Sequence, residues 1–458
     1  MSDAFRLEHD TMGAVRVPAS ALYSAQTQRA VQNFPISQMR FGRSFIGALG
    51  LVKMAAAKAN KEMGLVPSPI ADVIELASRE VMEGRHDAQF VVDVFQTGSG
   101  TSSNMNANEV IATRAAALLG APVHPNDHVN RSQSSNDVFP SALHIAAART
   151  AHHALLPAME TLQRALESKR DQFWDIPKIA RTHLQDAVPM RLGQEFGGYA
   201  RQVELSQQRT RKALDGIYEL PLGGTAVGSG LNAPDGFARA AIATIADTTG
   251  LPFREAQNHF EAQAARDAAV YLSGALKSYA IALTKIANDI RWLGSGPRCG
   301  LGELLLPEVQ PGSSIMPGKV NPVIAESVLM VCAQTIGYDA AISWAGTSGA
   351  FELNTMMPLI AYDLLQSLEL LAAASKNFAE RCIVGLRANE ERLRDSLERS
   401  LALATALTPE IGYERAAELS KIAYASNRTI REVAEEQSGL KQEQLAALLD
   451  INKMLGSK

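Results

Sequence analysis

The architecture follows from residues 265–293, whose sequence is A-R-D-A-A-V-Y-L-S-G-A-L-K-S-Y-A-I-A-L-T-K-I-A-N-D-I-R-W-L. Its apolar residues recur every three or four positions, which places them on one face of an α-helix. A helix of this length rises about 40 Å. The apolar stripe comprises Ala265, Ala268, Leu272, Leu276, Tyr279, Leu283, Ile286, Ile290 and Leu293.

Comparable patterns appear in four other segments, residues 138–172, 189–219, 323–344 and 352–382. Several helices of this length bury their stripes only by packing along one another. We therefore predict a mainly α-helical protein with a central bundle of long helices. The many alanines permit close approach of helices from other chains, so we predict a bundle that is shared between subunits.

Three domains are predicted along the chain. Residues 1–136 mix short helices with Gly-, Pro- and Asn-rich loops and a possible pair of strands. Residues 137–391 contain the long helical patterns. Residues 392–458 have shorter patterns with breaks such as Pro409 and Gly412, which predict a small helical domain.

Composition excludes several classes of protein. Of the 458 residues, 46% are hydrophobic and 20% are charged, as in an ordinary globular protein, and the formal net charge of −4 leaves no basic surplus for nucleic acid. No stretch approaches the roughly 18 apolar residues of a membrane span. Residues 1–10 carry charges where a signal peptide needs an apolar core, so we expect a cytoplasmic protein without nucleic-acid or membrane partners.

The cysteines and histidines indicate neither disulfide nor metal chemistry. Cys299, Cys332 and Cys382 are widely spaced, odd in number and set in apolar or helical surroundings, so we predict three buried thiols. The neighbouring His152 and His153 point about 100° apart on a helix and do not bind one ion together. We expect a protein that works without a metal.

Residues 312–322, G-S-S-I-M-P-G-K-V-N-P, place two hydroxyls, a lysine and an asparagine on a segment unsuited to regular helix or strand. Pro317 lacks an N–H group and Gly318 permits a positive φ, so we predict a flexible loop. Pro322 precedes the predicted helix 323–344, which holds the end of the loop on rigid structure. Such a loop is typical of a catalytic lid, and the alternative is a surface turn.

Two polar clusters precede predicted helices. Residues 97–109, T-G-S-G-T-S-S-N-M-N-A-N-E, surround two glycines with hydroxyls and amides, and residues 132–137, S-Q-S-S-N-D, precede a long helix. Neutral donors and free N–H groups at a helix N-terminus bind carboxylates, so we predict that Ser99 and Thr101 contact an anionic ligand. The alternative is a pair of capped helix starts.

His183 lies among polar and charged residues in R-T-H-L-Q-D, residues 181–186. We predict that a helix begins directly after this segment, at Pro189. Histidine has an ordinary pKa of about 6.5, which suits proton transfer when a carboxylate orients the ring. The candidate carboxylate is Glu326, in the first turn of the helix after residues 312–322, where the helix dipole favours an ionised acid. A structural histidine is the alternative.

Together these segments resemble class II fumarases of the fumarase/aspartase superfamily along essentially the whole chain. The motifs that carry the resemblance are T-G-S-G-T, H-P-N-D, S-Q-S-S-N-D, R-T-H-L-Q-D, G-G-T-A-V-G and G-S-S-I-M-P-G-K-V-N-P. His183 is the best discriminator, because aspartases usually have glutamine there. The resemblance implies a three-domain, mainly helical chain in a homotetramer with a twenty-helix core, whose active sites are each assembled from three subunits.

The resemblance also implies reversible hydration of fumarate to (S)-malate, a step of the tricarboxylic acid cycle, without metal or organic cofactor. Ser313 would remove the C3 proton of malate, and His183 with Glu326 would transfer a proton at the C2 oxygen through a water. Lys319 and Asn321 would hold the carboxylate beside C3 and stabilise the aci-carboxylate dianion. The other implied substrate-binding residues are Ser99, Gly100, Thr101, Ser134, Ser135, Asn136, Thr182 and Ser314.

The H-P-N-D motif resembles the family's secondary dicarboxylate site and contributes His124, Asn126 and Asp127. Gly120-Ala-Pro stands just before it, where relatives often have a longer and more basic stretch. A structural turn is therefore the alternative at this position.

Two other functions are compatible with the motifs. An aspartate ammonia-lyase needs the same carboxylate-binding groups and the same C3 base. A crystallin-like scaffold keeps the fold without catalysis, but the intact set of Ser313, Lys319, Asn321, His183 and Glu326 argues against it.

Overall fold

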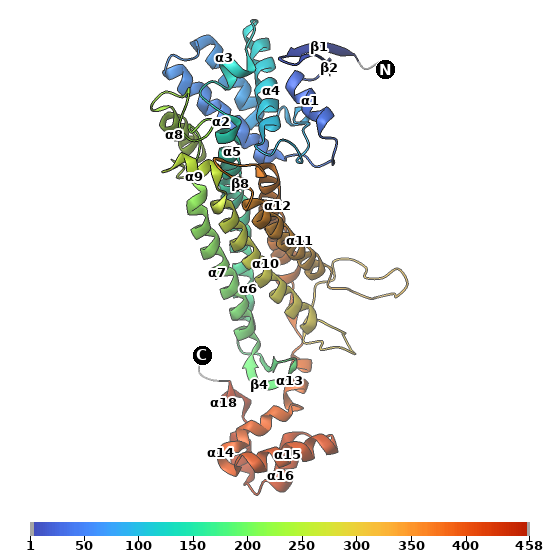
Figure 1. Ribbon diagram of the computed structural model, residues 1–458. Helices are drawn as coiled ribbons and strands as arrows, with labels where there is room; N and C mark the ends of the chain where they lie inside the picture. The colour runs from blue at the N-terminus through green and yellow to red at the C-terminus, as the bar shows by residue number, and fades with distance from the viewer. Residues whose placement is uncertain (1–3, 456–458) are drawn as a thin grey trace. The chain divides into compact units, whose positions relative to one another are not determined.

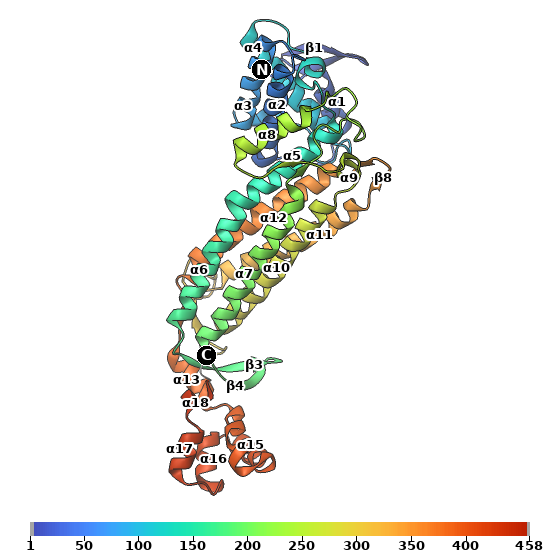
Figure 2. The same ribbon diagram turned by 90° about the vertical axis from the view of Figure 1, so that its left-hand side faces the viewer.

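The computed structural model describes residues 4–455 and divides into two compact units. Unit 1 comprises the residues up to Pro157 with Ser206–Ala280 and Val331–Ala373, and unit 2 comprises Ala158–Leu205, Ile281–Met330 and the residues from Ala374. Helices dominate both units (Figures 1 and 2), as the apolar stripes predict. The division into three domains at residues 136 and 391 stays a prediction.

Helix α2 (Arg43–Glu62) lies at the centre of unit 1. It packs against α3 (Ser68–Met82), α4 (Thr101–Leu119), α5 (Ser135–Thr150) and α8 (Phe237–Thr249). Nearly every residue of α2 from Phe45 to Asn60 is buried, because this apolar, alanine-rich run meets a neighbour on every side. The expectation of short helices in this region is therefore wrong for α2 and α4.

Small elements complete unit 1. The antiparallel strands β1 (Phe5–Asp10) and β2 (Gly13–Pro18) confirm the predicted strand pair, with Phe5 opposite Pro18. The other small elements of this unit are α1 (Ala25–Asn33), η1 (Asp87–Gln89), η2 (Pro125–Val129), β5 (Glu219–Leu220), β6 (Arg254–Glu255), α9 (His259–Ala264), β8 (Gly349–Ala350) and β9 (Leu353–Asn354).

Long helices account for all the segments with long apolar patterns. α5 continues through a π-turn, η3 (Ala151–Leu155), into α6 (Leu156–Gln172) as one helical run. The others are α7 (Leu192–Ile217), α10 (Asp267–Leu293), α11 (Val323–Gly346) and α12 (Met357–Phe378), the last followed by the π-turn η4 (Ala379–Ile383).

The predicted stripe is the buried face of α10. Every stripe residue from Leu272 to Leu293 is buried, whereas Ala265 lies before the helix begins. In unit 1, Asp339 on α11 accepts a hydrogen bond of 2.8 Å from Ser273 on α10. In unit 2, Tyr199 on α7 donates to Asp289 on α10 at 2.9 Å, and Figure 2 shows these two helices side by side.

The helix predicted to begin at Pro189 is wrong at its start. Residues 177–191 form an antiparallel hairpin of β3 (Pro177–Thr182) and β4 (Gln185–Arg191), in which Pro189 lies opposite Ile179. The residue before a proline avoids the helical region, and the missing N–H of proline is tolerated in a two-stranded ladder with free edges. Helix α7 begins only at Leu192.

The helix predicted over residues 352–382 also begins later than expected. Glu352 lies in the turn between β8 and β9, and α12 starts at Met357. Asn354 favours this boundary, because its Oδ1 accepts the N–H of Met356 at 2.9 Å, just ahead of the helix. Pro358 then occupies the first turn, where its missing N–H is not needed.

The C-terminal part of unit 2 consists of short helices around its own apolar cluster, which includes Leu403, Leu407, Leu419, Ile430 and Val433. Its elements are β10 (Arg387–Ala388), α13 (Glu390–Glu398), η5 (Leu401–Leu407), α14 (Thr408–Ile411), α15 (Tyr413–Ser426), α16 (Ile430–Gln437), α17 (Gln442–Leu448) and α18 (Ile451–Met454). Strand β10 pairs with β7 (Leu304–Leu305), which lies earlier in the chain.

The three cysteines are free thiols, and two of them are buried as predicted. Cys332 and Cys382 lie inside the protein, but Cys299 is exposed. It belongs to the loop G-S-G-P-R-C-G, residues 294–300, where Gly and Pro prevent the apolar helical surroundings that were expected.

The expectation that no stretch approaches a membrane span is wrong by length and composition alone, because two helices are long and apolar enough to cross a membrane. In the most apolar window of Met357–Ile383, 61% of the residues are buried, as in a core helix. In the most apolar window of Val323–Gly346, 33% of the residues are buried, although apolar residues occur on every side of α11. Met330 and Trp344 on α11 are 68% and 73% exposed, so this helix presents an uncovered apolar surface within the single chain.

Candidate active site

The T-G-S-G-T segment leads into the N-terminus of α4, as predicted. Gly100 precedes the helix with a φ of 74°, and a Cβ at this position would overlap the ring of Phe139. Glycine is therefore required both for the backbone conformation and for the lack of space. The hydroxyls of Ser99 and Thr101 are 2.8 Å apart and share a hydrogen bond at the helix start. The partial positive charge of this helix end suits a carboxylate.

The S-Q-S-S-N-D segment caps α5 in a similar way. Ser134 is the N-cap residue, and its Oγ accepts the N–H of Asn136 at 3.2 Å. The N–H of Ser134 in turn donates to the carboxylate of Asp137 at 2.9 Å. The capped helix start, which was the alternative interpretation of this cluster, is therefore present, and it leaves the side chain of Ser135 at the first turn of the helix.

Asp137 ties this cap to the G-G-T-A-V-G segment. Its Oδ2 accepts the N–H groups of Gly223 and Thr225, both at 2.9 Å, while Asn136 donates to the carbonyl of Ala226 at 2.8 Å. Burial raises the pKa of Asp137 to about 6, although these N–H groups lower it in part. The G-G-T-A-V-G motif thus positions the helix cap.

Unit 1 brings the two predicted substrate-binding clusters together. Asn104 in the second turn of α4 donates to Ser135 Oγ at 2.9 Å and to Asn130 Oδ1 at 3.2 Å. Phe139 of α5 fills the space that the absent side chain of Gly100 leaves. The two helix starts therefore lie close together, and their hydroxyls, amides and N–H groups are the kinds of donor that suit a carboxylate.

His183 lies at the tip of the β3–β4 hairpin, where a helix entrance was expected. His183 and Leu184 form a two-residue turn with φ values of 59° and 61°, and Thr182 lies opposite Gln185. Positive φ at both central residues is typical of a type I′ hairpin turn, which usually holds Asn or Gly because other residues are strained there. The strain marks His183 as a candidate for function.

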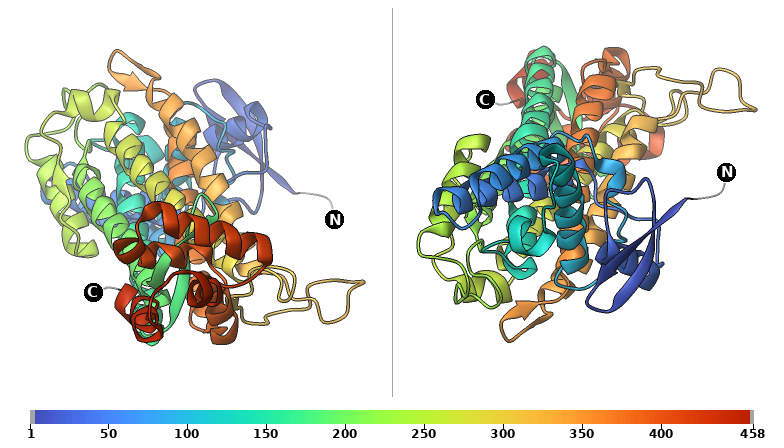
Figure 3. Two further views of the ribbon diagram at one scale, coloured as in Figure 1. Left: turned by 90° about the horizontal axis from the view of Figure 1, so that it is seen from below. Right: turned by 90° about the horizontal axis from the view of Figure 1, so that it is seen from above.

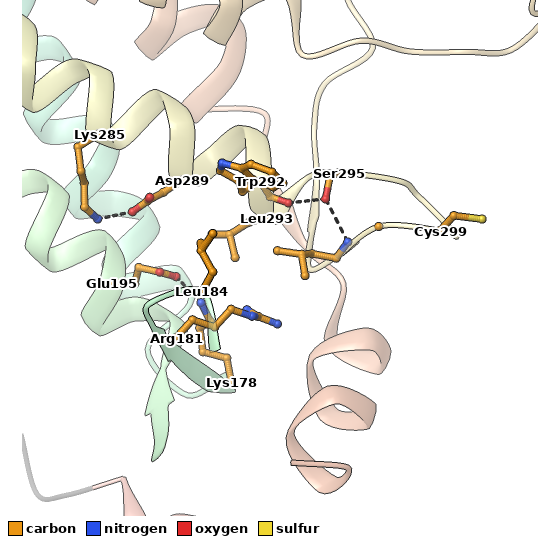
Figure 4. A pocket seen from close by; sticks show the side chains of 12 residues that line it. Lys178, Arg181, Leu184, Glu195, Lys285, Asp289, Trp292, Leu293, Ser295 and Cys299 are labelled. Carbon is orange, nitrogen blue, oxygen red and sulfur yellow. Dashed lines mark hydrogen bonds and ion pairs between the residues drawn. The ribbon is translucent and has the colours of Figure 1, made fainter. Parts of the chain in front are cut away.

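A charged network includes residues of this hairpin, and Figure 4 shows its members Lys178, Arg181 and Glu195. Lys178 on β3 is buried, and its ammonium lies 2.7 Å from the carboxylate of Glu195 and 3.6 Å from that of Glu303. Glu303 is fully buried and also pairs with Arg181, two residues before His183. Beside the network lies a cavity of about 710 Å³, which Leu184, Trp292 and other residues line.

The 312–322 segment is an irregular loop, as predicted, and it closes on itself. The N–H of Gly312 donates to the carbonyl of Lys319 at 2.7 Å, and Asn321 Nδ2 donates back to the carbonyl of Gly312 at 2.6 Å. Gly318 has the expected positive φ, 78°. Figures 1 and 3 show this loop extending away from the ends of the helices that it joins.

Ser313 has a distinct environment in this loop. Its Oγ accepts the N–H of Ile315 at 3.2 Å and the N–H of Met316 at 3.0 Å. Two donors on one hydroxyl oxygen favour its ionised form over its neutral form. Ser314 and Lys319, in the same loop, have exposed side chains that bond to no other side chain among residues 4–455.

Glu326 lies in the first turn of α11, as predicted, and its N–H donates to the carbonyl of Pro322 at 3.0 Å. Within the described part of the chain, its carboxylate forms no hydrogen bond or ion pair with His183. The pairing of these two residues stays a prediction.

The H-P-N-D motif forms a compact turn. His124 is the N-cap of η2, and its Nδ1 accepts the N–H groups of Asn126 and Asp127 at 3.3 and 3.0 Å. His128 Nδ1 in turn accepts the N–H of His124. This geometry matches the structural alternative for the motif, and binding of a second dicarboxylate stays a prediction.

Sequence reasoning missed the residues behind the two helix starts. Lys53 in α2 donates to Asn130 at 3.0 Å and to Gln133 at 2.9 Å. The available signal was a single lysine inside the apolar run F-I-G-A-L-G-L-V-K-M-A-A-A, residues 45–57. A lysine so placed is buried and needs polar partners. The partners themselves are distant in sequence and were not predictable from this run.

Comparison with known proteins agrees with the geometry. A family profile described as Lyase matches residues 13–337, and one described as Fumarase C C-terminus matches residues 403–456. The class of protein is thus a lyase.

The relatives are more specific. Fumarate hydratase class II of Mycobacterium tuberculosis is 56% identical over 429 residues, which cover 93% of this chain and 90% of the relative. The crystal structure of class II fumarase from Schistosoma mansoni matches with a TM-score of 0.96 at 39% identity and covers 98% of this chain and 99% of that one. A fumarate lyase:delta crystallin from Brucella melitensis, in a structure bound to cobalt, has a TM-score of 0.94 at 46% identity over 99% and 100% of the two chains. The chain belongs to the class II fumarase family.

Proposed function

We propose that this chain catalyses the reversible hydration of fumarate to (S)-malate. The observation that carries the proposal is the joined pair of helix N-termini, where Ser99, Thr101 and Ser135 offer neutral donors to a carboxylate. Near full-length similarity to proteins named fumarate hydratases supports the same reaction. The proposal is tested by following the absorbance of fumarate with purified protein. The absorbance must rise when malate is the substrate and fall when fumarate is the substrate.

In the proposed mechanism, Ser313 removes the C3 proton of malate. A serine is a weak base, and the N–H groups of Ile315 and Met316 support this role because they stabilise the alkoxide. Lys319 and Asn321 hold the adjacent carboxylate and stabilise the aci-carboxylate dianion, together worth several kcal/mol of transition-state stabilisation. His183, oriented by Glu326, exchanges a proton with the C2 oxygen through a water. No metal or organic cofactor takes part in this proposal.

The double-mutant cycle of His183→Asn and Glu326→Gln tests the pairing. We expect each single change to lower kcat by about a hundredfold, and the double variant to be little worse than either, because residues that act as one unit are non-additive. Steady-state kinetics of the four proteins measures this. Losses that multiply in the double variant would show that the two residues act independently.

The proposed assembly is a cytoplasmic homotetramer whose active sites are shared between subunits. The uncovered apolar surface of α11, with Met330 and Trp344 exposed, supports close packing against other copies of the chain. His183 and the 312–322 loop are exposed in the single chain, which leaves both available to a site completed by neighbouring subunits.

Mixing two inactive variants tests the shared sites. We expect Thr101→Val and Lys319→Met to be nearly inactive alone, and mixed tetramers formed by subunit exchange to regain part of the activity, since some sites then combine two unaltered segments. Mass spectrometry confirms mixing and the absorbance assay measures recovery. Mixed tetramers without activity would place both segments of each site in one chain.

A further inference from the structure

Lys53 is a fully buried cation without a carboxylate partner. Its ammonium donates to the side-chain oxygens of Asn130 and Gln133, at 3.0 and 2.9 Å, and within residues 4–455 it forms no ion pair. Burying a cation against neutral amides is costly, because the amides replace only part of the water that it loses. The fold alone does not require a charge at this point of the otherwise apolar run 45–57.

The ammonium is the centre of a network that reaches the substrate-binding clusters. Asn130 Oδ1 accepts from Lys53 and also from Nδ2 of Asn104 and Asn108, at 3.2 and 3.1 Å. Asn104 in turn donates to Ser135 Oγ. The path from Lys53 to Ser135 thus passes through two amides and joins α2, α4 and the start of α5.

The charge of Lys53 is not neutralised by contact. Of the charged groups on the helices packed against α2, Asp137 on α5 is the one that acts electrostatically on Lys53, and its own oxygens are bonded to backbone N–H groups. Glu109 on α4 is bonded to the N–H groups of Ser24, Gln26 and Thr27, and His144 on α5 to the carbonyl of Glu219. Within the described residues, no charged side chain of α3 or α8 bonds to the network.

We propose that Lys53 is a positioning residue for substrate binding: its ammonium holds residues 130–136 against α4 and places a positive charge behind the donors that receive a substrate carboxylate. The inference rests on the proposed function. A dianionic substrate bound by neutral hydroxyls and amides gains from a nearby cation in a low-dielectric interior, even without direct contact.

The proposal gives the KM for fumarate a pH dependence. Burial lowers the pKa of Lys53 to about 7, against the opposing effect of Asp137. In the folded protein, the ammonium is therefore lost as pH rises through about 7. Fumarate keeps both negative charges across this range, so KM is expected to rise on the alkaline side as the charge disappears.

The experiment compares Lys53→Met with Lys58→Met in the tetrameric protein. Methionine keeps the length of the side chain and removes the charge, while Lys58 is an exposed lysine on the same helix and serves as the matched control. Below about pH 7 we expect Lys53→Met to raise KM about tenfold with kcat within about twofold. Above that pH, wild type and Lys53→Met should converge, and Lys58→Met should follow wild type throughout.

A KM of Lys53→Met equal to that of wild type at every pH overturns the inference while leaving the proposed function intact. If the variant does not fold, calorimetry of succinate binding to wild type across the same pH range takes its place. Affinity that falls as pH rises through about 7 supports the role, and affinity without that fall removes it. Absence of fumarate hydration by wild type would instead reject the proposed function.

Discussion

Malate is expected to be consumed with a kcat/KM at least about a thousandfold above that for aspartate, a difference of about 4 kcal/mol in transition-state binding. After C3 deprotonation an ammonium departs as a neutral amine without help from an acid. A hydroxyl leaves poorly unless it receives a proton. In the proposed mechanism His183, on an exposed hairpin tip, provides such a proton through water, and this role favours the hydroxyl substrate.

The measurement follows fumarate formation from each substrate with one enzyme preparation, together with ammonia release from aspartate. His183→Gln is the informative companion variant, because it removes the acid and keeps a polar side chain of similar length. It should lose malate activity without gaining comparable aspartate activity. Release of ammonia from aspartate with a kcat/KM near that for malate would identify an ammonia-lyase with the same fold.

Ser313→Ala is expected to lower kcat by a hundredfold or more, the usual range when a general base is lost. The side chain is on a loop and is only partly buried, so the fold and the proposed tetramer should be unaffected. Its two N–H donors, from Ile315 and Met316, would be left to water at the loop surface, which costs little stability.

The matched control for this change is Ser438→Ala. Ser438 Oγ also accepts the N–H of the residue two positions later, at 3.2 Å, but it lies in the C-terminal helical segment. Loss of that hydroxyl should leave kcat within about twofold of wild type. If purified Ser313→Ala retains nearly normal kcat, another group removes the C3 proton and the loop has a binding role.

The sequence predicted the elements whose causes are local. The stripe of α10, the irregular loop around Pro317 and Gly318, and the cap at Ser134 each depend on residues that are neighbours in the chain. Local patterns also explain the error at Pro189, since the apolar residues around it suit either a helix start or a strand.

The buried polar networks could not be predicted in this way. Lys53 and its partner Asn130 are 77 positions apart, and Arg181 and Glu303 are 122 positions apart. Periodicity in a sequence indicates which residues face the interior, but it does not indicate which distant polar groups meet there. The hairpin that carries His183 was missed for a different reason. Its strands pair locally, with Thr182 opposite Gln185, but the turn residues His183 and Leu184 are not the Asn or Gly that usually indicate such a turn.

The contact between Gly100 and Phe139 limits how this enzyme can be re-engineered. Phe139 also packs against Phe41 and Phe45, so the backbone of the proposed carboxylate-binding segment lies directly on the aromatic core. Gly98 is equally confined, by the carbonyl of Thr355. To change the acid that binds at this helix start, positions 99 and 101, which carry the hydroxyls, are therefore the ones to vary. A library that also randomises the two glycines would consist mostly of proteins that do not fold.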